Sequence, residues 1–99
     1  MENLRNNALK DVLLEKYIGK MDEACGEGKE FIVTLRHDKV NEAISRVLEK
    51  VSVEHSVAGM LTKAKYKDKQ VDIFRTGKLV IREFHGIEEA ESFLGELLE

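Results

Sequence analysis

The thiol and imidazole side chains of this chain, which could ligate a metal such as zinc, are Cys25, His37, His55 and His85. Zinc sites usually draw their thiolate and imidazole ligands from pairs that lie a few residues apart. Here the four residues are spread along the chain, each close to the end of an expected helix or strand. We therefore expect loop or capping roles for the histidines and no metal site, with convergence of the four in the fold as the open alternative.

Acid–base or phosphate chemistry has equally little support. His85 with Glu88 and Glu89 could form an acid–base set, but acidic residues in the first turn of a helix also interact favourably with its dipole. The glycines of 26–28 precede an expected strand, and a strand supplies a poor cradle for an anion. The chain has no glycine-rich phosphate loop, nucleophile elbow or His-Glu-x-x-His motif. We expect no enzyme activity and no cofactor.

Basic residues gather in one part of the chain. Residues 58–82 hold seven Lys and Arg against two Asp, a local charge of +5, whereas the whole chain has a net charge of −3. The basic residues are Lys63, Lys65, Lys67, Lys69, Arg75, Lys78 and Arg82. A mildly acidic protein can still present a basic surface, which makes phosphate a candidate ligand. Lysines that protect an exposed sheet from aggregation are the alternative explanation.

Composition sets the class of protein. The 99 residues, 42% of them hydrophobic, suffice for one domain with a core, which we expect to span residues 1–99. Cys25 has no partner for an internal disulfide, which is typical of the reducing cytoplasm. No apolar run is long enough to cross a membrane, and the start does not resemble a secretory signal, so we expect a cytoplasmic protein. Abundant Lys and Glu give a weak indication of a thermophilic source.

Hydrophobic periodicity predicts three helices and several strands. Residues 3–24 read as an amphipathic helix whose apolar stripe includes Leu14, Tyr17, Ile18 and Met21. The further predictions are strands over 30–36 and 56–66, a hairpin of 71–75 and 78–84, and helices over 39–51 and 87–98. The expected fold is α+β, with an antiparallel sheet of about four strands in the order β-α-β-β-β-α, helices on one face and an additional N-terminal helix.

Alternation along the strands separates two faces of the sheet. A three-residue loop over 75–77 places Val71, Ile73, Leu79 and Ile81 together on a core face. The outer face then carries Asp72, Phe74, Lys78, Val80 and Arg82, joined by Lys63, Lys65, Val57, Gly59 and Leu61. Exposed apolar groups on a sheet usually indicate a covered surface. The cover could be nucleic acid, a second copy, a protein partner, or the helix over 3–24.

The run Ile73-Phe74-Arg75-Thr76-Gly77-Lys78-Leu79-Val80 resembles the hairpin of one repeat of the TATA-box-binding protein family, apolar-Phe-x-Ser/Thr-Gly-Lys-apolar-Val. Upstream, Val33-Thr34-Leu35 and Lys63-Ala64-Lys65 are similar to further parts of that repeat. The resemblance covers about residues 29–98 as a diverged single repeat. It implies a curved sheet that contacts a DNA minor groove, with Phe74 as a wedge, Val80 on base edges, and Lys63, Lys65 and Lys78 on phosphates. Val57 stands at the second wedge position, and Arg82 replaces a groove-facing Thr.

We therefore expect a small non-enzymatic protein that binds nucleic acid, DNA or RNA, or acts in transcription, through the basic and apolar sheet face. The residues expected to bind are Lys63, Lys65, Phe74, Lys78, Val80 and Arg82. The alternative is a homodimeric or protein-interaction module that uses the same face or the N-terminal helix as its interface.

Overall fold

The structure, a computed structural model, describes residues 11–24 and 29–99. Six strands of these residues form one antiparallel sheet in the spatial order β1-β2-β6-β5-β4-β3. Their bounds are β1 Ile18–Glu23, β2 Phe31–Leu35, β3 Ser52–Val57, β4 Leu61–Tyr66, β5 Lys69–Phe74 and β6 Lys78–Ile81. The α+β class and the antiparallel sheet are thus confirmed, but the sheet has more strands than the expected four.

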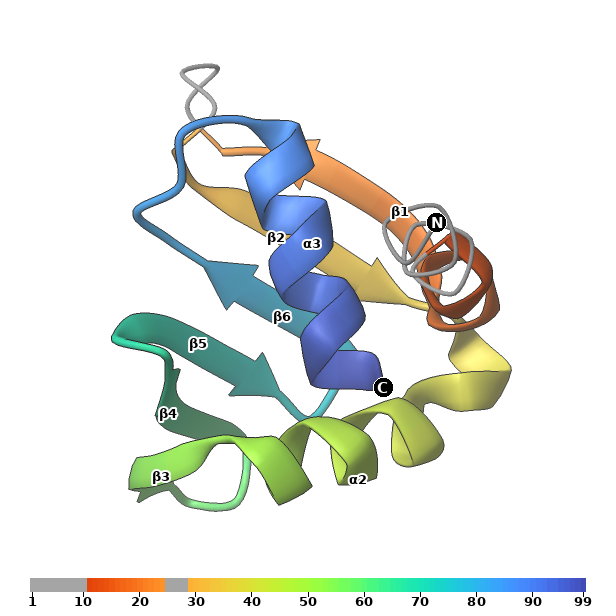
Figure 1. Ribbon diagram of the computed structural model, residues 1–99. Coiled ribbons are helices and arrows are strands. Elements are labelled where there is room, and N and C mark those ends of the chain that lie inside the picture. The colour runs from red at the N-terminus through yellow and green to blue at the C-terminus, as the bar shows by residue number, and fades with distance from the viewer. Residues whose placement is uncertain (1–10, 25–28) are drawn as a thin grey trace.

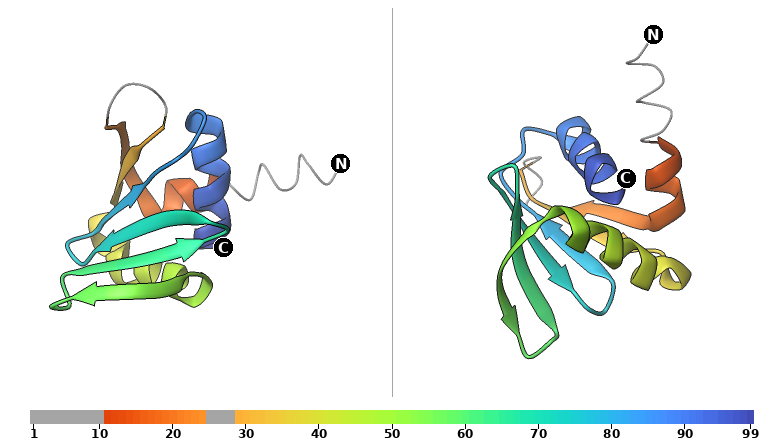
Figure 2. Two further views of the ribbon diagram at one scale, coloured as in Figure 1. Left: turned by 90° about the vertical axis from the view of Figure 1, so that its left-hand side faces the viewer. Right: turned by 60° about the horizontal axis from the view of Figure 1, so that its bottom comes forward.

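Helices pack against one face of this sheet. They are the helical residues 11–17, the short helix η1 His37–Lys39, α2 Val40–Lys50 and α3 Ile87–Leu98. Figure 1 shows α3 in front of the sheet with α2 below it, and Figure 2 shows the same arrangement from two other directions. The helix predicted over 87–98 has the predicted bounds, because its apolar residues recur three and four apart without interruption.

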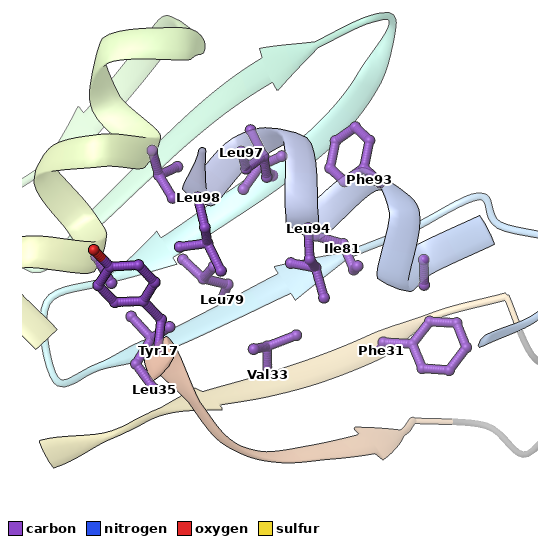
Figure 3. Packing of buried hydrophobic residues seen from close by; sticks show 14 of the residues in the cluster. Tyr17, Phe31, Val33, Leu35, Leu79, Ile81, Phe93, Leu94, Leu97 and Leu98 are labelled. Atoms are coloured by element: carbon purple, nitrogen blue, oxygen red, sulfur yellow. The ribbon is translucent and has the colours of Figure 1, made fainter. Parts of the chain in front are cut away.

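The core lies between α3 and the strands. Val33, Leu79 and Ile81 project from the sheet toward Leu94 and other residues of α3, as Figure 3 shows. Each of these side chains is almost completely buried. Tyr17 and Phe31 lie at opposite ends of the cluster. The alternation that predicted a core face for Val71, Ile73, Leu79 and Ile81 is confirmed, since all four belong to this cluster.

The hairpin β5–β6 has the three-residue loop predicted from its pattern. Phe74 pairs with Lys78, and the Gly77 amide donates a 2.9 Å hydrogen bond to the Phe74 carbonyl oxygen. Gly77 has a φ of 110°, and a Cβ at that position would lie 2.9 Å from Cγ2 of Val40 at the start of α2. The loop therefore requires glycine for its backbone conformation and for its contact with α2.

The helix predicted over 3–24 is wrong in its second half. Residues 11–17 are helical, but residues 18–23 form strand β1, and residues 3–10 lie outside the described part of the chain. A β-bulge at Gly19 shifts the register between Ile18 and Lys20. Ile18 and Met21 both pack against the core although they are three residues apart. The bulge thus gives a strand the apolar spacing of a helix.

The single strand predicted over 56–66 is also wrong. Residues 52–57 and 61–66 are separate strands, β3 and β4, joined by a turn at residues 58–60. Ala58 and Gly59 have φ values of 50° and 71°, which reverse the chain. All six residues of β3 are exposed, so no buried alternating pattern marks this strand in the sequence.

Candidate nucleic-acid interface

The face of the sheet opposite the helices, here called the open face, is built from side chains of all six strands. Two rows of paired residues cross it from β1 to β3. The first row is Asp22, Ile32, Val80, Asp72, Lys63 and His55, and the second is Lys20, Thr34, Lys78, Phe74, Leu61 and Val57. The helical residues Leu13 and Leu14 pack against the core cluster instead, on the other face.

A band of apolar side chains crosses the open face. Ile32, Val80, Phe74 and Leu61 are half-buried and lie on the neighbouring strands β2, β6, β5 and β4. Val57 continues the band on β3 and is 45% exposed. None of these five belongs to the core cluster that the described residues form. The band is therefore apolar surface that the described helices leave uncovered.

Lysine side chains flank the band on several strands. Lys63 and Lys78 are exposed, and neither forms an ion pair with another described residue. Lys65 lies 3.8 Å from Glu54, and Lys20 lies 3.7 Å from Asp22, both in exposed pairs. Exposed pairs of this kind contribute little to stability and can exchange their partners. The lysines can therefore meet an anion without a large cost in free energy.

A polar network occupies the middle of the open face. The guanidinium of Arg82 donates from Nη1 to Asp72 Oδ2 at 2.7 Å and from Nε to Glu30 Oε1 at 2.8 Å. Gln70 Nε2 donates to the other Asp72 oxygen at 2.9 Å. The hydrogen bond to Asp72, with the charges of both carboxylates, raises the pKa of Arg82 above its ordinary value. Arg82 thus offsets one of the two carboxylate charges, and Asp72, which is only 5% exposed, is the carboxylate held deepest in the sheet surface.

The six residues predicted to bind nucleic acid share the open face, although they differ in their surroundings. Phe74 and Val80 lie in the apolar band, and Lys63, Lys65 and Lys78 surround it. Arg82 differs because both of its carboxylate partners hold its guanidinium. Sequence reasoning missed Ile32 and Lys20 as members of this face. Alternation along β2 could have identified Ile32, whereas Lys20 was hidden by the incorrect helix.

Two of the lysines counted in residues 58–82 lie on the other face of the sheet. Lys67 pairs with Glu96 of α3, and Lys69 lies 3.4 Å from Glu89 of the same helix. The ammonium of Lys69 also lies 4.8 Å from the ring centroid of Phe84. The charge of +5 counted along residues 58–82 is therefore divided between the two faces. The basic side chains of the open face still outnumber its acidic ones.

The three histidines considered for metal chemistry lie in separate parts of the fold. His37 is in η1, His55 is in β3, and His85 precedes α3, and all three are exposed. Cys25 lies outside the described residues. Within the described ranges no group of three His, Cys, Asp or Glu side chains could hold a metal ion. His85, Glu88 and Glu89 are exposed at the start of α3.

The chain has no match among known proteins, so a proposal about its function rests on the fold and the open face. No family model, no curated protein and no solved structure matches the chain. Among the described residues, no helix has the length and apolar character needed to cross a membrane.

Proposed function

We propose that this protein binds nucleic acid through the open face of its sheet. The observation that carries the proposal is the half-exposed apolar band beside Lys63 and Lys78, two exposed ammonium groups without ion-pair partners among the described residues. Nucleic acids present this combination of chemistry, with charged phosphates beside the apolar faces and edges of bases.

The parts of the face have different roles in this proposal. Lys63, Lys65 and Lys78 contact phosphates, and their charge supplies affinity that does not depend on sequence. Phe74 stacks on a base or wedges between two bases, with Val80 against base edges. Arg82 acts indirectly, because its pairing with Asp72 and Glu30 offsets one of the two carboxylate charges at the centre of the face.

The order of elements from β2 to α3 supports a TATA-box-binding-protein-like core. This order is a strand, a helix, a series of antiparallel strands and a C-terminal helix, with the two helices on one face. One more strand separates α2 from α3 than we expected from the sequence, because β3 and β4 are distinct. Strand β1 is an addition that pairs along the edge of β2.

Fluorescence anisotropy with labelled single-stranded RNA, single-stranded DNA and duplex DNA tests the proposal at low and physiological salt. We expect binding at low salt that Lys78→Glu and Lys63→Glu weaken for every sequence. Lys39→Glu is the matched control, because Lys39 lies in η1 and not on the open face. Circular dichroism checks that each variant is folded.

The same experiment has outcomes that contradict the proposal. Binding that is equally strong in Lys78→Glu, Lys63→Glu and wild type would place nucleic acid elsewhere on the molecule. Absence of binding even at low salt, together with a stable dimer that Phe74→Glu dissociates, would assign the apolar band to a second copy of the chain.

A further inference from the structure

A groove lies on the helix-bearing side of the sheet, between α2 and the β3–β4 hairpin. Its volume is about 440 Å³. It is separate from the open face, because Thr62 lines the groove while its neighbour Lys63 belongs to the open face. The groove can therefore be occupied independently of any ligand on the open face.

Apolar side chains, some of them exposed, form part of the walls of the groove. Ile44 and Leu48 contribute from α2, and Met60 contributes from the β3–β4 turn. Leu48 is 42% exposed and Met60 is 66% exposed, although both are large hydrophobic side chains. Ile73 is almost fully buried and also lines the groove. A ligand with an apolar body would bury this exposed surface on binding.

The spacing of residues along α2 explains why this helix has a second apolar stripe. Ala43 and Val47 are buried in the core. Ile44 and Leu48 each follow one of these residues by one position, so they lie about 100° around the helix from the core side. Ser45 accompanies them along the groove. This stripe of α2 thus lines the groove, and Ile44 also packs against the edge of the core cluster.

Arg75 supplies the one charged side chain among the described residues that line the groove. Its backbone amide donates a 3.0 Å hydrogen bond to the Met60 carbonyl oxygen, which joins the two loops. Its Nη1 atom lies 3.8 Å from the position that a Cβ on Gly59 would occupy. No carboxylate of the described residues forms an ion pair with this guanidinium. The other polar lining groups are uncharged, and they include the hydroxyls of Ser45 and Thr62.

We propose that this groove binds a small amphiphilic carboxylate, a molecule with an apolar tail and one acid group. The tail packs against Ile44, Leu48 and Met60, and Arg75 receives the carboxylate in the paired geometry that guanidinium groups favour. The groove volume lies within the range of small-molecule sites, and the groove combines apolar side chains with polar groups that can fix the orientation of a ligand.

Amide chemical shifts of the labelled full chain test this proposal with octanoate, and with octylammonium as a probe of opposite charge. We expect octanoate to shift the amides of Ser45, Thr62 and Arg75 in a saturable manner, and octylammonium to bind at least about tenfold more weakly. Equal binding of both probes would overturn the role of Arg75. Shifts confined to Phe74 and its neighbours on the open face would overturn the site itself.

Variants provide a second and independent test. Arg75→Gln is expected to weaken octanoate binding about tenfold, because it removes the charge and keeps a polar side chain. Ser45→Phe places a ring in the groove and is expected to abolish binding, whereas Ser92→Phe, at an exposed serine of α3, leaves it intact. Unchanged octanoate affinity in folded Ser45→Phe would contradict the proposal. Because the open face is elsewhere, the nucleic-acid affinity of Ser45→Phe remains that of the wild type if that face binds nucleic acid.

Discussion

The ammonium of Lys50, in the last turn of α2, donates a 2.9 Å hydrogen bond to the carbonyl oxygen of Glu96, in the last turn of α3. The final carbonyl groups of a helix have no partners within that helix and carry a partial negative charge. Helix α3 has no basic residue in its own last turn. The neighbouring helix therefore supplies the compensating charge, and Arg46 does the same for the carbonyl oxygen of Glu99 at 3.1 Å.

We predict that Lys50→Met lowers the free energy of unfolding by about 1 kcal/mol, because it removes this hydrogen bond and its charge from the end of α3. Urea denaturation measures the change. Lys39→Met, at a lysine next to the start of α2, is the control and should alter stability by less than half as much. Equal effects of the two substitutions would show that the contact between α2 and α3 does not depend on Lys50.

Gly77→Ala is expected to destabilise the protein by about 2 kcal/mol, since alanine disfavours a positive φ and its Cβ would contact Val40. Gly59→Ala provides a matched comparison at a φ of 71°, where the nearest atom is 3.8 Å from the added Cβ. This second variant should cost about 1 kcal/mol from backbone conformation alone. Thermal denaturation of both variants separates the two contributions, and equal losses would contradict a role for the Val40 contact.

Stability is expected to fall at acid pH in part through Glu42. A hydrogen bond from the Tyr17 hydroxyl, with the Lys16 ammonium 3.4 Å away, holds the pKa of Glu42 below its ordinary value of 4.5. Folding therefore favours the charged carboxylate. This contribution is complete above the pKa of the unfolded chain and is lost as the pH falls through the lower pKa of the folded protein.

Melting temperatures measured between neutral and strongly acid pH test this expectation. The difference in melting temperature between wild type and Glu42→Gln should be largest near neutral pH and should shrink below about pH 4. Glu49→Gln serves as the control on the same helix, because Glu49 is an exposed glutamate. A constant difference across the whole range would show that the contact does not favour ionisation of Glu42.

The parts of the fold that could be predicted are those in which a buried face repeats regularly. The core faces of β5, β6 and α3 follow directly from such repeats, and the loop before Lys78 follows from their register. The prediction missed strand β1 because the bulge at Gly19 alters the repeat of buried residues along this strand. The prediction missed strand β3 as a separate strand because an exposed edge strand has no buried face to leave a pattern in the sequence.

Prediction of the candidate site has a similar physical limit. Alternation placed Phe74, Val80 and Lys78 on one face because those residues follow a strand with a buried opposite side. The ion-pair partners of Arg82 could not be predicted, because Glu30 is brought to it by pairing between distant strands. The groove beside α2 was missed for the same reason, since its walls come together only when the β3–β4 turn packs near the helix.

The contributions of charge and of apolar contact on the open face can be separated by the salt dependence of nucleic-acid binding. Three lysines on phosphates predict a slope of about −2 to −3 in a plot of the logarithm of affinity against the logarithm of salt concentration. Lys78→Gln should reduce the steepness of this slope by about 0.7 to 0.9. Phe74→Leu should instead lower affinity at every salt concentration by about 1 kcal/mol and leave the slope unchanged, because stacking on a base releases no counterions. Wild-type affinity of Phe74→Leu would show that the aromatic ring does not contact the nucleic acid. A wild-type slope for Lys78→Gln would show that the Lys78 ammonium does not contact a phosphate.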